Sequence, residues 1–207
     1  AATLLITLFL GIEEGIGAGV TLSLILLIYR STKPHYAILG RLPNTKDYRN
    51  VGRFSQLEVF PEILAFRYDA PLYFANSSHF SDALTAQKTA KGDALKLIII
   101  HCGSISRIDA TGYQTLQELV QDFHAEGVQV FFSGVIGPVR DFFAKVGFTE
   151  EVGAEKFFLD VDSAVSYFQS ENADPSLQNS SATQANLKRK SKWLIIWKAL
   201  KFDEKPL

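Results

Sequence analysis

The apolar positions of this chain divide it into a lipid-like beginning and a water-soluble remainder. Residues 1–29 hold only two charged side chains, and polar, loop-like sequence follows Arg30. A stretch of this length and composition is typical of helix within a membrane. We therefore expect residues 1–30 to be the terminal, truncated transmembrane helices of a larger membrane protein, since the chain also contains no Met with which it could begin.

Two apolar blocks, residues 4–10 and 16–28, lie on either side of an interruption at residues 11–15. Each block alone is short for a full span of about 20 residues, so we expect two helices joined at this interruption. Glu13 and Glu14 within it have two interpretations. Carboxylates inside a membrane often mark an ion path, whereas the flanking glycines favour a turn at the water interface. We favour the turn.

Basic residues follow the second apolar block closely, at Arg30, Lys33, Arg41, Lys46, Arg49 and Arg53. Short segments rich in Lys and Arg next to a membrane helix stay on the cytoplasmic side. The charge distribution therefore predicts that residues 31–207 are cytoplasmic.

The rest of the pattern alternates short apolar runs with helical periods. Residues 31–57 show no period and are punctuated by Pro, Gly and Asn, so we expect a linker there. The expected strands are 63–68, 72–75, 95–101, 128–132 and a short edge strand at 157–159. The expected helices are one capped by Asn76, Ser77 or Ser78 that runs to about Lys91, then 111–126, 138–146, and a last one that Asp160 or Asp162 caps and that runs through Phe168.

The strand at residues 95–101, LKLIIIH, is apolar almost throughout, which is typical of a strand covered on both faces. Helices between such strands favour parallel pairing. Residues 58–170 are therefore expected to form one α/β domain. We expect a small sheet of roughly four to five mostly parallel strands, with the helices packed mainly on one side.

Net charge is uneven along the chain and argues against one class of partner. Residues 188–207 carry seven Lys or Arg against two acidic residues, so the other residues sum to −6 within a total of −1. An acidic body argues against nucleic-acid binding. Cys102 is the single cysteine and forms no intrachain disulfide, and the four histidines lack the spacing of metal ligands. We expect no metal and no cofactor.

Two strand-to-helix junctions hold the residues best placed for binding. In an open α/β sheet such junctions lie at the carboxyl ends of the strands, where ligands usually bind, and helix N-termini suit anions. The alternative, which explains the same residues fully, is that they are ordinary helix caps and turns. The candidate ligand or interface residues are Asp109, Thr111, Gly112, Ser133, Gly134 and Gly137.

No catalytic constellation is evident in the sequence. His101, Ser104 and Asp109 are close along the chain, but no nucleophile motif such as G-x-S-x-G surrounds them. A histidine at a strand end is more often a structural residue than a reactive one. The Walker A and G-x-G-x-x-G spacings are also lacking. We expect a protein that is not an enzyme, and a small hydrolase is the weakest of the interpretations.

Four segments, taken in order, resemble the C-terminal part of the SulP/SLC26 family of anion permeases. They read GIEEGIGAGVTLSLILLIYR, ILGRLPNTKDYRN, YDAPLYFANSSHF and IIIHCGSISRIDATGYQTLQEL. The resemblance covers about residues 1–170. Its soluble part is similar to the STAS domain (sulfate transporter and anti-sigma factor antagonist) of that family.

The resemblance implies secondary-active transport of inorganic anions, of the sulfate or bicarbonate class, by a multi-pass protein of the plasma membrane. It also implies that the substrate site lies in upstream helices, so no substrate-binding residue is assigned to this chain. The implied partners are the bilayer, the remaining transmembrane part, a second copy in a homodimer, and a weakly bound nucleotide or anion at the STAS domain. That domain is implied to regulate or assemble the transporter.

One departure from the STAS pattern concerns phosphorylation. In stand-alone STAS proteins a phosphorylatable Ser directly follows the Asp of the IDATG junction, and here Ala110 takes that place. The alternative function is a soluble regulatory module of the anti-sigma-factor-antagonist kind. Residues 1–29 argue against it, because a soluble module has no use for a membrane segment.

The residues that follow the domain form two segments of different composition. Residues 171–187 are polar and are expected to be disordered, and residues 188–207 are expected to form a basic amphipathic tail. Two partners for its apolar face remain open: an anionic leaflet, or the protein's own membrane part or a partner subunit. The candidate membrane-contact residues are Trp193, Trp197, Lys190 and Lys198.

Overall fold

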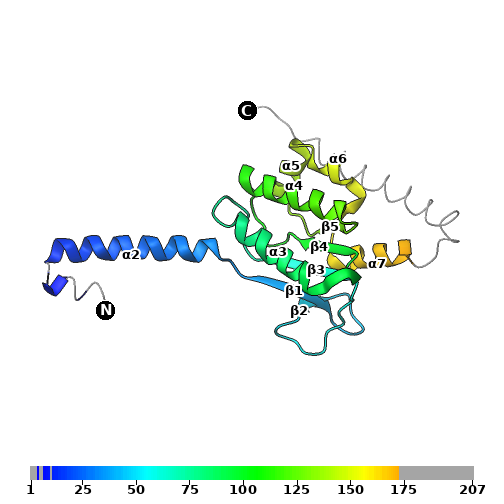
Figure 1. Ribbon diagram of the computed structural model, residues 1–207, viewed down its shortest axis with the longest axis horizontal. Coiled ribbons are helices and arrows are strands. Elements are labelled where there is room, and N and C mark those ends of the chain that lie inside the picture. The colour runs from blue at the N-terminus through cyan, green and yellow to red at the C-terminus, as the bar shows by residue number, and fades with distance from the viewer. Residues whose placement is uncertain (1–3, 5–6, 10, 173–207) are drawn as a thin grey trace.

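A computed structural model describes residues 4, 7–9 and 11–172, and it shows a long helix that projects from an α/β body (Figure 1). Two predictions from the sequence concern residues that the structure does not describe. Residues 173–187 of the segment expected to be disordered, and the expected basic tail with Trp193, Trp197, Lys190 and Lys198, lie outside the described part of the chain. Residues 171–172 of that segment end a helix instead.

Helix α2 (Ile12–Thr32) is the projecting element. Its large apolar side chains are all more than half exposed, and they surround the helix instead of lining one face. Among the described residues it is the one helix that is long and apolar enough to cross a membrane. Lipid is an environment in which a helix with such a surface is stable.

A break at Gly11 separates α2 from the helical residues 7–9. Gly11 has a φ of 122°, a backbone conformation that favours glycine. Glu13 and Glu14 follow in the first turn of α2, and both are exposed. Carboxylates at that position complement the positive end of the helix dipole. Helical residues lie on either side of Gly11, and α2 begins four residues before the apolar block that predicted it. Glu13 and Glu14 therefore lie in the helix and not in the turn that we expected, because the helix continues back to Ile12.

The body contains a six-stranded sheet in the order β2-β1-β3-β4-β5-β6. Its strands are β1 (Tyr36–Arg41), β2 (Tyr48–Asn50), β3 (Ile63–Tyr68), β4 (Leu97–His101), β5 (Gln129–Ser133) and β6 (Phe157–Phe158). Strands β3 to β6 pair in parallel, whereas β1 pairs antiparallel with both β2 and β3. The mostly parallel α/β sheet is confirmed, with one strand more than expected.

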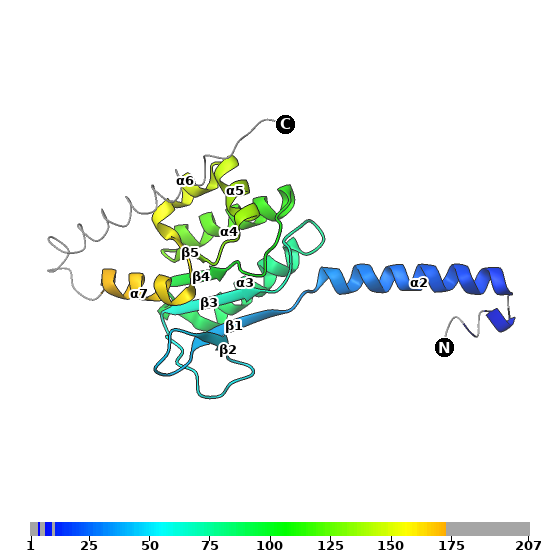
Figure 2. The ribbon, with the colours of Figure 1, turned by 180° about the vertical axis from the view of Figure 1, so that it is seen from behind.

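Residues 31–57 are not the linker that the sequence indicated. Strands β1 and β2 both lie within this range, and β1 sits inside the sheet between β2 and β3 (Figure 2). Ala37 and Leu39 of β1 are buried, and the ring of Tyr36 stacks on that of Phe66 with centroids 5.3 Å apart. The prediction was wrong because six residues with a glycine carry little pattern of their own. Pairing with β3 stabilises this strand.

The strand expected at residues 72–75 is also absent. Leu72 makes an isolated strand-like bridge to Ile108, and residues 74–76 form a turn. The backbone amides of Tyr73 and Phe74 donate to side chains and not to a neighbouring strand. Side-chain acceptors of this kind compete with sheet pairing and favour turns.

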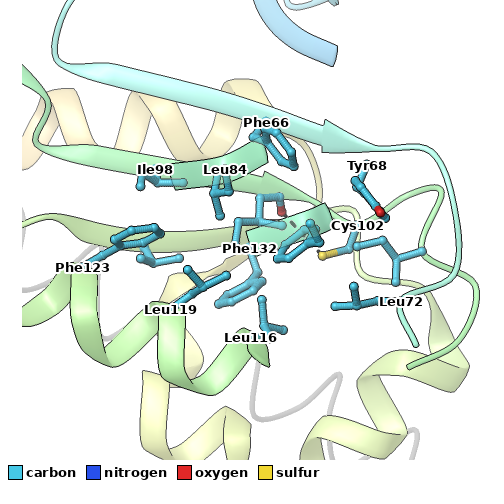
Figure 3. Packing of buried hydrophobic residues seen from close by; sticks show 14 of the residues in the cluster. Phe66, Tyr68, Leu72, Leu84, Ile98, Cys102, Leu116, Leu119, Phe123 and Phe132 are labelled. Carbon is cyan, nitrogen blue, oxygen red and sulfur yellow. Dashed lines mark hydrogen bonds between the residues drawn. The ribbon is translucent and has the colours of Figure 1, made fainter. Parts of the chain in front are cut away.

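Helices cover both faces of the sheet, with four of them on one side. One face carries α3 (Ser77–Lys91), α4 (Ala110–Ala125), α5 (Gly137–Lys145) and α6 (Phe148–Val152), and the other carries α7 (Val161–Asn172). Short 3₁₀ turns occupy Gly92–Ala94 and Ala154–Lys156. Leu116, Leu119 and Phe123 of α4 point towards the strands (Figure 3). The expected asymmetry of the helical layers is confirmed.

Candidate functional site

The carboxyl ends of the parallel strands and the end of α2 lie at one edge of the body. β1 starts at Tyr36, which pairs with Tyr68 at the end of β3. Three residues, 33–35, separate α2 from β1. We call this region the helix-side edge; it consists of residues 33–35 and the loops that follow β3, β4 and β5. Both candidate junctions belong to it.

Asp109 ties two loops of the helix-side edge together. Its Oδ1 accepts a hydrogen bond from the backbone amide of Gly112 at 2.8 Å, which caps α4. Its Oδ2 accepts from the backbone amide of Phe74 at 3.0 Å. The capping interpretation of this residue is therefore correct but incomplete, because the second oxygen holds the turn that follows β3.

Gly112 allows α4 to pack closely against the turn that follows β3. A Cβ at this position would lie 2.7 Å from the carbonyl oxygen of Leu72, nearer than real side chains approach. The glycine thus allows the first turn of α4 to lie directly against the backbone after β3. Thr111 is exposed in the same helical turn.

At the second candidate junction, which follows β5, Ser133 and Gly134 pack against the ring of His101. Ser133 is fully buried, and its Oγ lies 3.1 Å from Nδ1 of His101. Gly134 has a φ of 64°, and a Cβ there would meet the imidazole at 2.7 Å. His101 therefore fills the space beside these residues, as expected of a structural histidine. Gly137 begins α5, where a Cβ would meet nothing within 4 Å.

Beside His101, on the side of the sheet towards β1, the helix-side edge carries charged side chains. Arg67 pairs in register with His101, and its Nε donates to Asp69 at 2.7 Å. Asp69 also lies 2.8 Å from Nδ1 of His35. Burial by itself would raise the pKa of Asp69, but hydrogen bonds from Arg67 and His35, together with their charges, lower it below its ordinary value.

Burial lowers the pKa of His101, and the nearby charge of Arg67 lowers it further. The neutral imidazole is therefore the favoured form in the folded protein. Neutral imidazole has one nitrogen that donates and one that accepts, which suits the hydroxyl of Ser133. Its contacts identify His101 as part of the packing between β4 and β5.

The turn at residues 72–76 was missed as part of this site. Asn76 is 1% exposed, its Oδ1 accepts from the amide of Tyr73 at 3.0 Å, and its Nδ2 donates to the carbonyl of Pro71 at 2.9 Å. Residues 72–75 predicted a strand because they are consecutive apolar residues. The Asn at its end was the available signal of a turn.

The polar side chains of this edge hold backbone segments in place. Among the described residues, no group of three or more His, Cys, Asp or Glu side chains is arranged to bind a metal ion. Asp109 is engaged by two amides, and Ser133 is buried against His101. The arrangement is suited to joining α2, the turn 72–76 and α4 into one unit.

A comparison with known families assigns the fold. Residues 55–164 match the STAS domain family, which covers more than half of the chain. The parallel strands, the helices between them and the capped IDATG junction all lie within this match. The chain therefore belongs to the STAS domain family.

Among curated proteins, the chain is similar to sulfate transporters. "Sulfate transporter 4.1, chloroplastic" of Arabidopsis thaliana is 35% identical over 182 residues, which is 82% of this chain and 27% of that protein. "Sulfate anion transporter 1" of Homo sapiens is 27% identical over 210 residues, 80% of this chain and 30% of that protein. The chain thus spans less than a third of the length of these relatives.

A solved structure shows the same fold. The murine Slc26a9 anion transporter in its inward-facing state superposes with a TM-score of 0.70 at 24% identity, over 81% of this chain and 27% of that one. The STAS match and the sulfate-transporter relatives confirm the resemblance to the SulP/SLC26 family. The domain is therefore a STAS domain of the anion-transporter kind.

Proposed function

We propose that this chain is the portion of a secondary-active inorganic anion transporter that joins a terminal transmembrane helix to a cytoplasmic STAS domain. The transported anion belongs to the sulfate or bicarbonate class. The names of the relatives, which are sulfate transporters, favour sulfate. The proposed location is the plasma membrane, as part of a multi-pass protein.

The observation that carries this proposal is the direct connection between α2 and the sheet. An apolar helix exposed on all sides leads, through three residues, into a strand that pairs on both of its edges. A soluble regulatory module would expose this helix to water at a large cost in free energy. The exposed Arg30 and Lys33 at its end support a cytoplasmic position for the domain.

The proposed role of the STAS domain is to regulate or assemble the transporter, without chemistry of its own. Asp109 and Gly112 support a structural role without chemistry, because they join the turn 72–76 to α4. Ala110 stands where stand-alone STAS proteins have their phosphorylatable Ser, so a different signal is required. A homodimer is the proposed assembly, and weak binding of a nucleotide or anion at this junction is the second part of the proposal.

Transport by the complete polypeptide tests the proposal. Uptake of radiolabelled sulfate and bicarbonate into vesicles, with and without Na⁺, should show transport of one of them. Deletion of residues 33–172 should lower the maximal rate or the amount of transporter in the plasma membrane. The ratio of sulfate to bicarbonate transport should stay unchanged, since the anion site is proposed to lie in other helices.

His124→Gln is a suitable control for that experiment, because His124 is exposed on α4 and away from the helix-side edge. This variant should transport at the rate of the unmodified protein. A deletion that switched the preferred anion would contradict the division of roles. Failure of the complete polypeptide to move either anion would contradict the proposed substrate class.

A further inference from the structure

We propose that the turn at residues 72–76 is a membrane anchor, in which Phe74, with Tyr73 beside it, inserts into the headgroup region of the leaflet from which α2 emerges. The partner is a lipid surface that contains anionic lipid. This inference rests on the proposed function, because it takes α2 to cross a membrane. It adds a second attachment of the STAS domain to the bilayer.

The first observation is that the structure holds an exposed aromatic side chain in place. Phe74 is 71% exposed. Its backbone amide is held by Asp109, and the amide of Tyr73 is held by the buried Asn76. Asn76 also bonds to the carbonyl of Pro71. Polar side chains beneath the turn thus fix its backbone while its apolar ring points to the outside.

The second observation is the position of the turn relative to α2. The hydroxyl of Tyr73 lies 3.4 Å from the carbonyl oxygen of Ser31, in the last turn of that helix. The rings of Tyr73 and Phe74 are in contact, with centroids 5.8 Å apart. The end of a membrane-crossing helix lies at the level of the lipid headgroups, where aromatic side chains are enriched. Phe74 therefore lies at interfacial depth.

The third observation is the charge around the turn. Arg30 and Lys33 are exposed at the end of α2, and Arg107 is exposed on the loop whose carbonyl accepts from the amide of Leu72 at 2.9 Å. Basic side chains next to a membrane attract anionic lipid, with about 1 kcal/mol for each. The acidic neighbour Asp109 uses both oxygens on backbone amides. The local charge favours an anionic leaflet.

A lipid surface fits this turn better than another protein does. A stable protein interface buries about 800 Å² on each partner, which is more than one exposed ring supplies. Here the exposed ring of Phe74 projects beside the half-buried Tyr73 and exposed basic residues, and Leu72 and Asn76 of the same turn are buried. Two rings flanked by cations are typical of interfacial anchors.

Tryptophan fluorescence in vesicles tests the anchor. The chain with Trp193→Phe and Trp197→Phe is reconstituted into vesicles of phosphatidylcholine and phosphatidylglycerol, without bromine or with bromine on the acyl chains, placed either near the headgroup or near the chain ends. Three separate variants each carry one tryptophan: Phe74→Trp on the turn, Leu24→Trp inside α2, and Val59→Trp as a matched exposed position at the opposite edge of the sheet.

The expected result is that bromine quenches Trp at position 74 at least about twofold more than at position 59, because an interfacial ring lies roughly 5–10 Å into the headgroup boundary. Leu24→Trp, near the middle of α2, should be quenched by the bromine near the chain ends. Quenching at 24 but not at 74 overturns the anchor alone, and a blue-shifted, unquenched signal at 74 would assign the ring to a protein contact. If position 24 is not quenched, α2 is not embedded, and the proposed function fails together with the inference. Circular dichroism of each variant confirms that the fold is retained.

Discussion

Asp109 joins two segments that are 35 residues apart in the chain, and this double contact is testable against a simple helix cap. Asp160 caps α7 in the same way, with Oδ1 accepting from the amide of Ser163 at 2.7 Å. Each change to Ala should lower the free energy of unfolding by about 1 kcal/mol. Only Asp109→Ala should also reduce transport by each folded molecule, because it releases the turn 72–76.

The measurement pairs thermal unfolding of the chain in detergent micelles with uptake by the complete polypeptide in vesicles. Asp160→Ala serves as the matched control, since it removes a cap of the same geometry away from that turn. Equal transport by the two variants would show that Asp109 acts as a cap alone.

His101 gives the domain a pH-dependent stability. Its pKa is lowered in the folded state, so below the ordinary histidine value of about 6.5 the unfolded chain binds a proton that the folded chain does not. Stability should therefore fall as the pH drops through this range. Denaturant unfolding at pH 7.5 and 5.0 should show a smaller loss in His101→Gln than in the unmodified chain.

His124→Gln is again the control, because it removes an exposed histidine that lies away from the strands. A loss of stability that is the same with and without His101 would assign the pH dependence to other groups. Asp69, whose pKa is also lowered, contributes only at lower pH, since a carboxylate begins to bind protons near pH 4.

At the residue scale, the sequence predicted local contacts and missed those made across strands. The Asp109 cap follows from spacing, because its partner Gly112 is three residues away. The pairing of Ser133 with His101 depends on the register of β4 and β5, 32 residues apart, which no local pattern contains. For this reason Ser133 was expected at a binding edge and is instead buried.

At the scale of the elements, we predict that the domain needs strand β1 to fold. It buries Ala37 and Leu39 and covers the edge of β3, which holds the buried residues Leu64, Phe66 and Tyr68. A fragment of residues 33–172 should fold and unfold cooperatively. A fragment of residues 52–172 lacks β1 and β2, exposes an apolar strand edge, and should aggregate or unfold without cooperativity.

Denaturant unfolding and size-exclusion chromatography of the two fragments distinguish these outcomes. The longer fragment is the control for the shorter one, since both retain every helix from α3 to α7. If the two fragments unfold at the same midpoint, β1 adds no stability, and the domain boundary indicated by the sequence, residue 58, would be adequate.

Elements with strong periodicity were the ones that the sequence predicted well. The apolar run that became β4 and the helix stripe of α4 both carry a pattern that burial requires. Strand β1 has six residues and a glycine, and the turn 72–76 has consecutive apolar residues held by Asn76 and Asp109. Their structure is decided by partners elsewhere in the chain, so the local pattern was misleading.

At the scale of the whole molecule, α2, β1 and the helix-side edge form a continuous path from the membrane-type helix to the second strand of the sheet (Figure 1). A flexible tether of 27 residues would have allowed the STAS domain to move independently of the membrane. Three residues between α2 and β1 make such freedom small, and the contact of Tyr73 with Ser31 reduces it further.

The direction in which β1 enters the sheet decides how it responds to force. Its hydrogen bonds to β3 run across the strand, while a pull from α2 acts along it. The force then loads all of these hydrogen bonds in shear at the same time, so they do not break one after another. A displacement of the helix would therefore reach the domain as a rigid push or pull, with the sheet moving as a single body.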